Sequence, residues 1–355
     1  MKALILAGGT GTRLKPLTCT MAKQLVPVAN RPVLHYVMDK IAETGITDVG
    51  VIISPETGGQ IKTSIGEGEK WKVSITYILQ KSPAGLAHAV KTAQPFLKDS
   101  PFLMFLGDSL IRDRVNQLIQ RFFEENAQAA VLVKEVEDPR SFGVAVIDEH
   151  SRVLGLVEKP QNPPGNLALV GIYVLSPEIH RAIEKIKPSR RGELEITDAI
   201  QELLKTGHRV LSRKLPGWWV DTGNMERILE ANRAILGDFT ISSNMGETDT
   251  GSIISGRVQI GPGTRITSST VRGPAIIGEN CLIEESFIGP FTAIGNNTVI
   301  QKSAVQHSVI MENCMINCPS RLEDSVVGPR TKITQKHSYP GSLRLSLGEQ
   351  SEVVF

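Results

Sequence analysis

The chain has 355 residues, of which 41% are hydrophobic, and a formal net charge of +2. This length allows two domains, and this apolar fraction is enough for a packed core. The balanced charge and the absence of a long basic run argue against nucleic acid or anionic lipid as partners. No uninterrupted apolar stretch reaches about 18 residues, so we expect no membrane span, and the first residues lack the pattern of a secretory signal.

The first predicted element is a buried strand over residues 2–7, which leads directly into the glycine-rich sequence 8–14. Glycines at positions 8, 9 and 11 let the backbone approach a ligand closely and aim several N–H groups at one point. Arg13 and Lys23 add permanent positive charge nearby. This combination predicts a binding site for a polyphosphate.

Two familiar phosphate-binding motifs fit this segment less well. A P-loop requires a lysine directly after its last glycine, and here Thr12 follows Gly11. The dinucleotide-binding motif requires a third glycine where this chain has Leu14. A glycine turn that binds nothing is the structural alternative, and Arg13 and Lys23 argue against it.

Alternating strands and helices are predicted as far as about Gly237. The strand candidates are residues 49–54, 74–79, 102–106, 129–136 and 168–175. Helices are predicted where Val33, Val37 and Ile41 form an apolar stripe, and over 87–97 and 115–126. Such alternation is typical of an α/β fold with a mainly parallel, Rossmann-like sheet covered on both faces. Ligands on such sheets bind beyond the carboxyl ends of the strands.

A different pattern follows Gly237, because aliphatic residues then recur about every six positions. They are Ile254, Ile260, Ile266, Val271, Ile277, Ile283, Ile288, Ile294, Ile300, Val305, Ile310 and Ile316. A six-residue period predicts a left-handed parallel β-helix of about four coils, each with three flat sides. We therefore expect a catalytic domain over 1–237, a linker over 238–252, the β-helix over 253–331 and a C-terminal tail over 332–355. The β-helix faces suggest a homo-oligomer.

The four cysteines are scattered at Cys19, Cys281, Cys314 and Cys318. Cys314 and Cys318 lack the second cysteine pair or the histidines that a zinc site needs. We expect reduced thiols in a cytoplasmic protein.

The sequence LILAGGTGTRLKPLT, followed by KQLVPV, resembles the N-terminal motif of sugar-1-phosphate nucleotidyltransferases. It is most similar to the long type of glucose-1-phosphate thymidylyltransferase, which carries a C-terminal hexapeptide-repeat domain. Matching segments follow in order at 79–80, 85–89, 106–108, 142–144, 158–160, 191–198 and 219–223. The resemblance implies transfer of a nucleotidyl group from dTTP to glucose 1-phosphate, with pyrophosphate as the leaving group.

Two aspartates are the candidate ligands of a metal ion. Asp108 follows an apolar run that should be a central strand, and Asp221 lies in the sequence WVDTG. Carboxylates at the active edge of a sheet suit Mg²⁺, which keeps waters and phosphate oxygens as its other ligands. A helix cap or a turn is the structural alternative for each.

Lys159 is the candidate group for holding the sugar phosphate, and Glu158 could accept hydrogen bonds from sugar hydroxyls. Pro160 should bias Lys159 toward an extended backbone. The alternative is an exposed ion pair worth about 0–1 kcal/mol. By resemblance, Gly143 and Val170 make further sugar contacts, Arg191 lies near the phosphates and Glu193 reaches a sugar hydroxyl.

The remaining site residues also rest on the resemblance. It implies that Gln80 and Gly85 recognise the base, and that the nucleotide contacts Leu6, Gly8, Gly9, Gly11, Thr12, Arg13 and Asp108. The catalytic set is Arg13, Lys23, Asp108, Lys159 and Asp221. His35 and His88 lie on predicted helices, and we expect both to be structural.

Four alternatives stay open from the sequence. UTP could be the donor, because a pocket discriminates one methyl group by only about 1–3 kcal/mol, and another sugar 1-phosphate could replace glucose 1-phosphate. Acyl transfer in the β-helix would need a catalytic histidine, and His307 is the only histidine within the repeat. A non-catalytic, sugar-nucleotide-binding paralogue would be expected to lack an aspartate or a phosphate-binding cation, and all are present.

Overall fold

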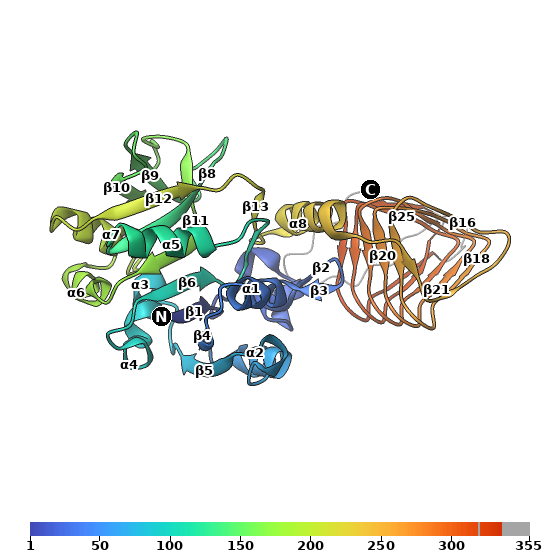
Figure 1. Cartoon of the computed structure of the whole chain (residues 1–355). Helices are drawn as coiled ribbons and strands as arrows, with labels where there is room; N and C mark the ends of the chain where they lie inside the picture. Colours follow the sequence, from blue (N-terminus) through green and yellow to red (C-terminus); the bar gives the residue numbers. More distant parts are fainter. Residues whose placement is uncertain (319, 336–355) are drawn as a thin grey trace. The chain divides into compact units, whose positions relative to one another are not determined.

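The computed structural model describes residues 1–318 and 320–335 (Figure 1). The chain forms two compact units. The first unit contains Met1–Thr10, Met21–Leu25 and Val33–Asp221, and the second contains Gly11–Thr20, Val26–Pro32 and the described residues that follow Asp221. Within the described ranges, every helix is too short or too polar to cross a bilayer.

The first unit is built on a nine-stranded sheet with the main order β10-β9-β11-β6-β1-β4-β5. Its strands are β1 (Lys2–Leu6), β4 (Asp48–Ile53), β5 (Ser74–Leu79), β6 (Phe102–Leu106), β8 (Ala129–Glu135), β9 (Gly143–Ile147), β10 (Val153–Glu158), β11 (Leu167–Leu175) and β12 (Val210–Lys214). Strands β6, β1, β4 and β5 are parallel neighbours, as are β8 and β12, whereas β11 runs antiparallel to β6, β8 and β9. This confirms the predicted Rossmann-like sheet.

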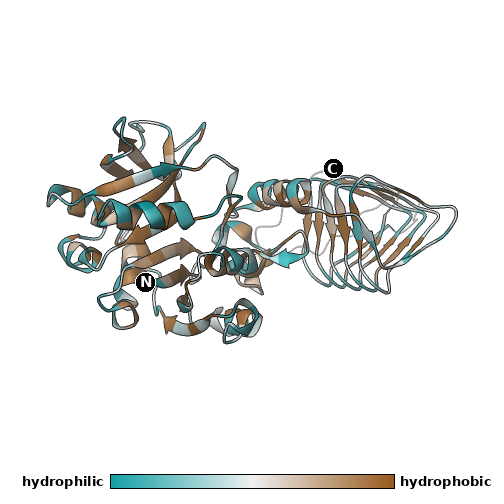
Figure 2. Ribbon diagram, in the orientation of Figure 1, coloured by the Kyte–Doolittle hydropathy of each residue, from teal (hydrophilic) through white to brown (hydrophobic). Residues whose placement is uncertain are grey.

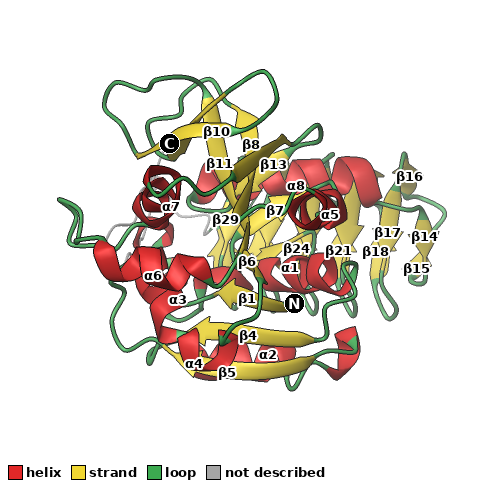
Figure 3. Ribbon diagram, turned by 60° about the vertical axis from the view of Figure 1, so that its left-hand side comes forward, coloured by secondary structure: helices red, strands yellow, loops and turns green. Residues whose placement is uncertain are grey.

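Helices cover both faces of this sheet (Figure 1, Figure 3). They are α1 (Val33–Ala42), α2 (Gly58–Ile65), α3 (Leu86–Thr92), α4 (Gln94–Leu97), α5 (Asn116–Glu124), α6 (Glu178–Lys185) and α7 (Ile196–Lys205). Strand β1 shows why two cores form: Ala3 and Ile5 pack with α1 and α5, and Leu4 packs with α3, α6 and α7. Alternate side chains of a strand point to opposite faces, so one apolar strand supplies both cores.

The helix predicted over 87–97 is two helices, α3 and α4. Pro95 lies in the first turn of α4. Proline has no N–H to donate, so it is tolerated at a helix start but interrupts a helix interior.

A small two-stranded sheet completes the first unit. Strand β7 (Ser109–Ile111) directly follows the central strand β6 and pairs antiparallel with β13 (Trp219–Asp221). Asp221 lies opposite Ser109 in this pairing. The end of β13 is therefore beside the carboxyl end of β6.

The second unit contains α8 (Met225–Phe239) and three parallel sheets of short strands, the arrangement of a left-handed β-helix. The first sheet contains β14 (Ser243–Asn244), β17 (Val258–Ile260), β20 (Ala275–Ile277), β23 (Thr292–Ile294), β26 (Val309–Ile310) and β29 (Val326–Val327). The second contains β15 (Glu247–Thr248), β18 (Arg265–Thr267), β21 (Leu282–Glu284), β24 (Val299–Gln301), β27 (Met315–Asn317) and β30 (Lys332–Thr334). The third contains β16 (Ile253–Ser255), β19 (Thr270–Arg272), β22 (Phe287–Ile288), β25 (Ala304–Gln306) and β28 (Arg321–Glu323).

Aliphatic side chains at the six-residue period fill the interior of the β-helix. Ile266, Ile283, Ile300 and Ile316 are aligned by strand register, and each is at most 1% exposed. Figure 2 shows hydrophobic residues along these strands and along the central strands of the first unit.

The repeat is longer than the four coils predicted, because two of the sheets have six strands. In the first coil, Asn244 pairs in register with Ile260 and Thr248 with Ile266. Polar residues therefore occupy the aliphatic positions where the repeat begins, and the period is not visible there. Of the predicted C-terminal tail, residues 332–334 form β30, and residues 336–355 lie outside the described part of the chain.

Two N-terminal segments fold with the second unit. The hairpin of β2 (Pro27–Val28) and β3 (Arg31–Pro32) is held by Asn232 of α8, which accepts a hydrogen bond from the Ala29 N–H at 2.9 Å and donates to the Phe291 carbonyl at 2.9 Å. Asn30 donates to the Ile294 carbonyl at 2.5 Å. These contacts connect the hairpin, α8 and the coils of the β-helix.

Candidate active site

Lys23, Asp108 and Asp221 come together in the first unit. Lys23 begins the 3₁₀ helix η3 (Lys23–Leu25), Asp108 follows β6 and Asp221 ends β13. The Lys23 ammonium forms an ion pair with Asp108 Oδ2 and lies 4.0 Å from Asp221 Oδ1. The side chains are 11%, 19% and 29% exposed, respectively, so the group is accessible but largely screened from solvent.

The two carboxylates fit the chemistry of a divalent metal site. One oxygen of Asp108 and one oxygen of Asp221 both face the positively charged Lys23 Nζ. Residues 1–318 and 320–335 contain no cluster of three or more acidic, histidine or cysteine side chains suited to a metal. Two carboxylates are sufficient for Mg²⁺ when phosphate oxygens and waters supply its other ligands.

The glycine segment after β1 lies against two buried glutamines. A Cβ atom on Gly8 would lie 3.5 Å from Gln80 Oε1, and one on Gly9 would lie 3.5 Å from Gln24 Nε2. Gln24 is only 2% exposed, and its Oε1 has no hydrogen-bond partner among the described residues. Leu6, at the end of β1, is itself buried, and its carbonyl accepts a hydrogen bond from the Gly107 N–H at 3.0 Å.

Gln24 is a site candidate that the sequence analysis missed. A buried amide oxygen without a partner is costly, and a bound ligand that donated to it would remove that cost. The one sequence signal is a polar residue in the otherwise apolar stretch after Lys23.

Gly11, Thr12 and Arg13 belong to the second unit. Gly11 has a φ of 65° and precedes the 3₁₀ helix η1 (Thr12–Leu14). The Thr18 hydroxyl donates to the Gly11 carbonyl at 2.7 Å. Arg13 is exposed, and Leu14 beside it is buried.

The predicted base-binding residues are in contact with each other. Gln80 Nε2 lies 2.9 Å from His88 Nδ1 and 3.4 Å from the Gly85 carbonyl oxygen. Gly85 has a φ of 104°, and a Cβ there would lie 2.4 Å from the Leu194 carbonyl oxygen, so only glycine fits. His88, expected to be structural, makes a hydrogen bond to a predicted ligand-binding side chain.

The predicted sugar-binding residues form a second cluster in the first unit. Glu158 Oε1 lies 3.5 Å from Arg191 Nη1 and 3.8 Å from Lys159 Nζ, and Glu158 Oε2 accepts a hydrogen bond from Thr197 at 3.1 Å. Arg191 also pairs with Glu193. Lys159 and Arg191 can therefore bind a phosphate. The carboxylates of the cluster can accept hydrogen bonds from sugar hydroxyls.

Glu195 lies behind this cluster and was not predicted. It is 3% exposed, its carboxylate is 3.7 Å from Arg191 Nε, and it accepts a hydrogen bond from Ser189 at 2.8 Å. Burial raises the pKa of Glu195, while the hydrogen bond from Ser189 acts in the opposite direction.

The backbone of Lys159 differs from the expectation. Its φ is 39°, in the left-handed region, whereas Pro160 should favour an extended residue. The N–H of Lys159 donates to the Phe142 carbonyl at 3.1 Å, immediately after the β9–β10 pairing. This tertiary contact accompanies a conformation that the local sequence disfavours.

Val170 and Gly143 are packing positions as well as predicted contacts. Val170 is fully buried, and its carbonyl accepts a hydrogen bond from Ser109 at 3.0 Å. A Cβ on Gly143 would lie 2.8 Å from both Leu169 Cδ1 and Thr197 Cγ2. Glycine at 143 therefore lets β9 approach the residues that hold Glu158.

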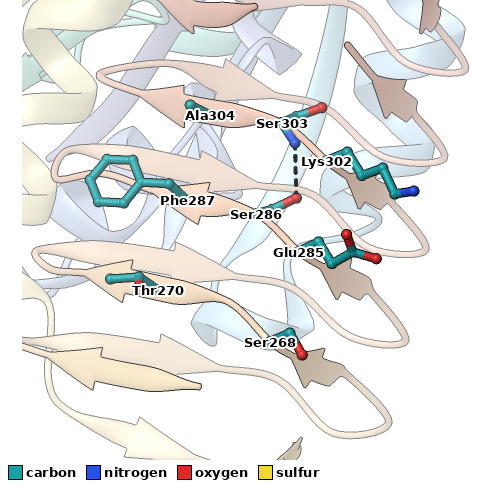
Figure 4. A pocket seen from close by; sticks show the side chains of 8 residues that line it. All are labelled: Ser268, Thr270, Glu285, Ser286, Phe287, Lys302, Ser303 and Ala304. Atoms are coloured by element: carbon teal, nitrogen blue, oxygen red, sulfur yellow. Dashed lines mark hydrogen bonds between the residues drawn. The ribbon is translucent and has the colours of Figure 1, made fainter. Parts of the chain in front are cut away.

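A separate shallow pocket of about 350 Å³ lies on the β-helix (Figure 4). Its lining residues are Ser268, Thr270, Glu285, Ser286, Phe287, Lys302, Ser303 and Ala304. In Figure 4 the Ser286 hydroxyl accepts a hydrogen bond from the Ser303 N–H, at 3.2 Å, between adjacent coils. This pocket contains none of the predicted site residues.

Comparison with known proteins identifies the family of this chain. Residues 2–237 match the family model described as nucleotidyl transferase. The chain is 46% identical over 354 residues to glucose-1-phosphate thymidylyltransferase of Streptomyces antibioticus, covering 99% of each chain. It is 43% identical over 356 residues to the low-salt glycan biosynthesis nucleotidyltransferase Agl11 of Haloferax volcanii, again covering 99% of each.

A solved structure of a putative glucose-1-phosphate thymidylyltransferase from Bacillus anthracis is also similar. It has a TM-score of 0.63 and 34% identity, and the match covers 68% of this chain and 98% of that one. With a family match across residues 2–237 and relatives that align from end to end, this chain belongs to the nucleotidyl transferase family.

Proposed function

We propose that this protein transfers a nucleotidyl group from dTTP to glucose 1-phosphate, giving dTDP-glucose and pyrophosphate. A phosphate oxygen of the sugar attacks the α-phosphorus, and the bond to pyrophosphate breaks. The carrying observation is the convergence of Lys23 with Asp108 and Asp221 at the edge of the sheet. The full-length similarity to proteins named glucose-1-phosphate thymidylyltransferase supports the choice of substrates.

UTP is the second candidate donor. A UTP–glucose-1-phosphate uridylyltransferase of Haloferax volcanii, AglF, is 34% identical, and the match covers 68% of this chain and 98% of AglF. Thymine and uracil differ by one methyl group, so both nucleotides belong in the first test.

Nucleotidyltransferases of this family use a divalent metal. We propose Mg²⁺, held by Asp108 and Asp221 in the first unit. Bound there, it would neutralise charge on the α-phosphate. Lys23 is already paired with Asp108 and can move its positive charge onto a phosphate when the substrate arrives.

The other cations have separate tasks in this proposal. Backbone N–H groups of Gly8, Gly9 and Gly11, with Thr12 and Arg13, bind the phosphates of the nucleotide. Lys159 holds the attacking phosphate, and Arg191 supports it. Both reactants are anions, so most of the catalytic gain comes from holding them in line and screening their charges.

Glu158 and Glu193 accept hydrogen bonds from sugar hydroxyls in this proposal. Thr197 and Arg191 fix the Glu158 carboxylate, while Gly143 and the backbone at Val170 shape the space beside it. Gln80 and Gly85 bind the base, and Leu6 lies at the start of the nucleotide site in this proposal.

The proposal is tested by pyrophosphate release from dTTP, UTP, CTP, ATP and GTP, each with glucose 1-phosphate and Mg²⁺. We expect dTTP to be preferred and Asp108→Asn to lower the rate by at least about 10²-fold. Asp99→Asn, at an exposed aspartate outside the site, is the matched control and should retain the full rate. A higher rate with UTP would move the assignment to uridylyl transfer, and undiminished turnover by Asp108→Asn would refute the metal site.

Three further expectations stay proposals. We propose 1–237 as the catalytic domain, followed by the β-helix. We propose a homo-oligomer, because the flat faces of a β-helix offer extended surfaces for self-association. A cytoplasmic location is supported by the four cysteines, all of which are free thiols.

A further inference from the structure

The amide of Gln80 is held in one orientation by its surroundings. Gln80 follows β5, is 7% exposed, and its backbone N–H donates to the Ile53 carbonyl at 2.9 Å. Its Nε2 faces the Gly85 carbonyl oxygen at 3.4 Å and His88 Nδ1 at 2.9 Å.

The chemistry of these two neighbours defines which end of the amide faces them. A carbonyl oxygen can only accept, so the group facing Gly85 is the NH₂. Its second hydrogen points to His88 Nδ1, which accepts when the imidazole is neutral and carries its proton on Nε2. A reversed amide would place Oε1 against the Gly85 oxygen, which is repulsive.

The amide oxygen is consequently directed elsewhere. Gln80 Oε1 lies 3.5 Å from the position that a Cβ on Gly8 would occupy, so it faces the glycine segment. Within residues 1–318 and 320–335, no hydrogen bond to Oε1 is present, whereas both amide hydrogens have acceptors. Gln80 therefore offers a ligand an acceptor and no donor.

We propose that His88 is a positioning residue that fixes Gln80 as an acceptor, and that this pair selects pyrimidines with an N3–H. Thymine and uracil donate from N3 to Gln80 Oε1. Cytosine has a lone pair at N3 and meets the same oxygen with repulsion. The inference rests on the proposed function only in placing the base beside Gln80.

His88 supplies the stronger of the two restraints. The contact to Gly85 is long at 3.4 Å, whereas the contact to His88 has ordinary hydrogen-bond length. Without an acceptor at residue 88, the amide can rotate and present its NH₂ to cytosine. Loss of one correctly oriented hydrogen bond corresponds to about a tenfold loss of discrimination.

The test is calorimetric binding of dTTP, UTP and CTP without sugar phosphate, which does not depend on turnover. In the unaltered protein we expect dTTP and UTP to bind at least about tenfold more tightly than CTP. His88→Leu, which has no acceptor, should lose most of this preference. His88→Asn places an amide oxygen near the Nδ1 position and should restore it. His150→Leu, at a side chain that is 70% exposed, is the matched control.

Kinetics supply a second readout. With dTTP and glucose 1-phosphate, His88→Leu should raise KM for the nucleotide and leave kcat largely unchanged. Thermal unfolding of each variant separates a folding defect from a binding defect.

Several results would overturn the role of His88. They are equal binding of UTP and CTP by the unaltered protein, an unchanged preference in His88→Leu, or loss of preference in His88→Asn as well. Correct base preference without pyrophosphate release would instead count against the proposed transfer reaction and leave the His88 inference standing.

Discussion

Glu158 has neighbours on both of its carboxylate oxygens. Thr197 donates to one oxygen at 3.1 Å, and Arg191 lies 3.5 Å from the other. Gly143 leaves the space that this arrangement needs, because a Cβ there would lie 3.2 Å from Glu158 Oε2 and 2.8 Å from Thr197 Cγ2. A side chain at 143 must displace the groups that orient the carboxylate.

Gly143→Ala should therefore weaken sugar-phosphate binding. Overpacking costs about 1–3 kcal/mol, and here part of that cost displaces Glu158. We expect KM for glucose 1-phosphate to rise about tenfold or more, with a smaller change for dTTP, in steady-state kinetics. Gly155→Ala is the control, since the nearest atom to a Cβ there is 3.8 Å away. Equal changes for both substrates would contradict the assignment of this cluster to the sugar.

His180 in α6 makes stability depend on pH. The side chain is buried and stacks on Phe102 with ring centroids 6.2 Å apart. Burial lowers the pKa of His180, with opposing effects from Asp99 and Glu184. The unfolded chain therefore binds this proton more readily than the folded chain, and the free energy of unfolding falls as pH drops through the ordinary histidine range.

His180→Leu should remove this contribution. Urea unfolding between about pH 7 and about pH 5 should show a shallower loss of stability in the variant, by at most about 1.4 kcal/mol per pH unit. His150→Leu should keep the slope of the unaltered protein, because its side chain is 70% exposed. Identical slopes in His180→Leu and the unaltered chain would mean that His180 is not the titrating group.

For single residues, the sequence predicts charge and position along a strand, but it does not predict which side chains pair with each other. Asp108 was predicted because an apolar run placed it at a strand end. Gln24 and Glu195 were not among the predicted site residues, because a polar residue after a loop or on a helix looks the same in sequence whether it faces a ligand or solvent. Lys159 was misjudged because a tertiary hydrogen bond accompanies the backbone conformation that proline disfavours.

At the scale of elements, periodicity decided what could be predicted. The strands of the sheet follow from short apolar runs, and the coils of the β-helix follow from an apolar period of six. The first coil was invisible because polar Asn244 and Thr248 stand in register with Ile260 and Ile266 of the next coil. The pairing of β7 with β13, which brings Asp221 beside Asp108, joins residues over a hundred positions apart and leaves no local signal.

Asn232 is the central residue of the junction between α8, the hairpin and the β-helix. It is 1% exposed and makes hydrogen bonds to Ala29 and Phe291. Asn232→Ala leaves a buried N–H and a buried carbonyl without partners, at a cost of about 1–3 kcal/mol for each. We expect a clearly lower denaturation midpoint, measured by urea unfolding.

Glu226→Ala in the same helix is the control for that variant. Glu226 is exposed, so its replacement should change stability by no more than about 0.5 kcal/mol. Asn232→Asp retains the acceptor for Ala29 but loses the donor to Phe291 and buries a carboxylate, so it should also lower the midpoint. An unchanged midpoint in Asn232→Ala would show that the hydrogen bonds of Asn232 do not stabilise the second unit.

At the scale of the whole molecule, the chain crosses repeatedly between its two units. Residues 11–20 and 26–32 belong to the unit of the β-helix, while 1–10 and 21–25 belong to the unit of the sheet. The predicted nucleotide-binding motif is thus divided in sequence, with Gly8 and Gly9 in one unit and Arg13 in the other. A division of the chain at a single residue cannot describe these two units, because residues 11–20 and 26–32 group with the β-helix.

A shortened chain that ends at Thr240 should consequently lose order in its N-terminal segments. Removing the β-helix deletes the Ile294 carbonyl that accepts from Asn30, and the Gly328 region, where a Cβ would lie only 3.1 Å from Leu17 Cδ2. Hydrogen–deuterium exchange should be faster at residues 11–20 and 26–32 than in the full chain. Exchange in β4 should be unchanged, since its partners β1 and β5 remain. Because Arg13 lies in the affected segment, binding of dTTP should weaken as well. Equal protection of 11–20 and 26–32 in both chains, with equal affinity for dTTP, would show that the β-helix is dispensable for the phosphate-binding segment.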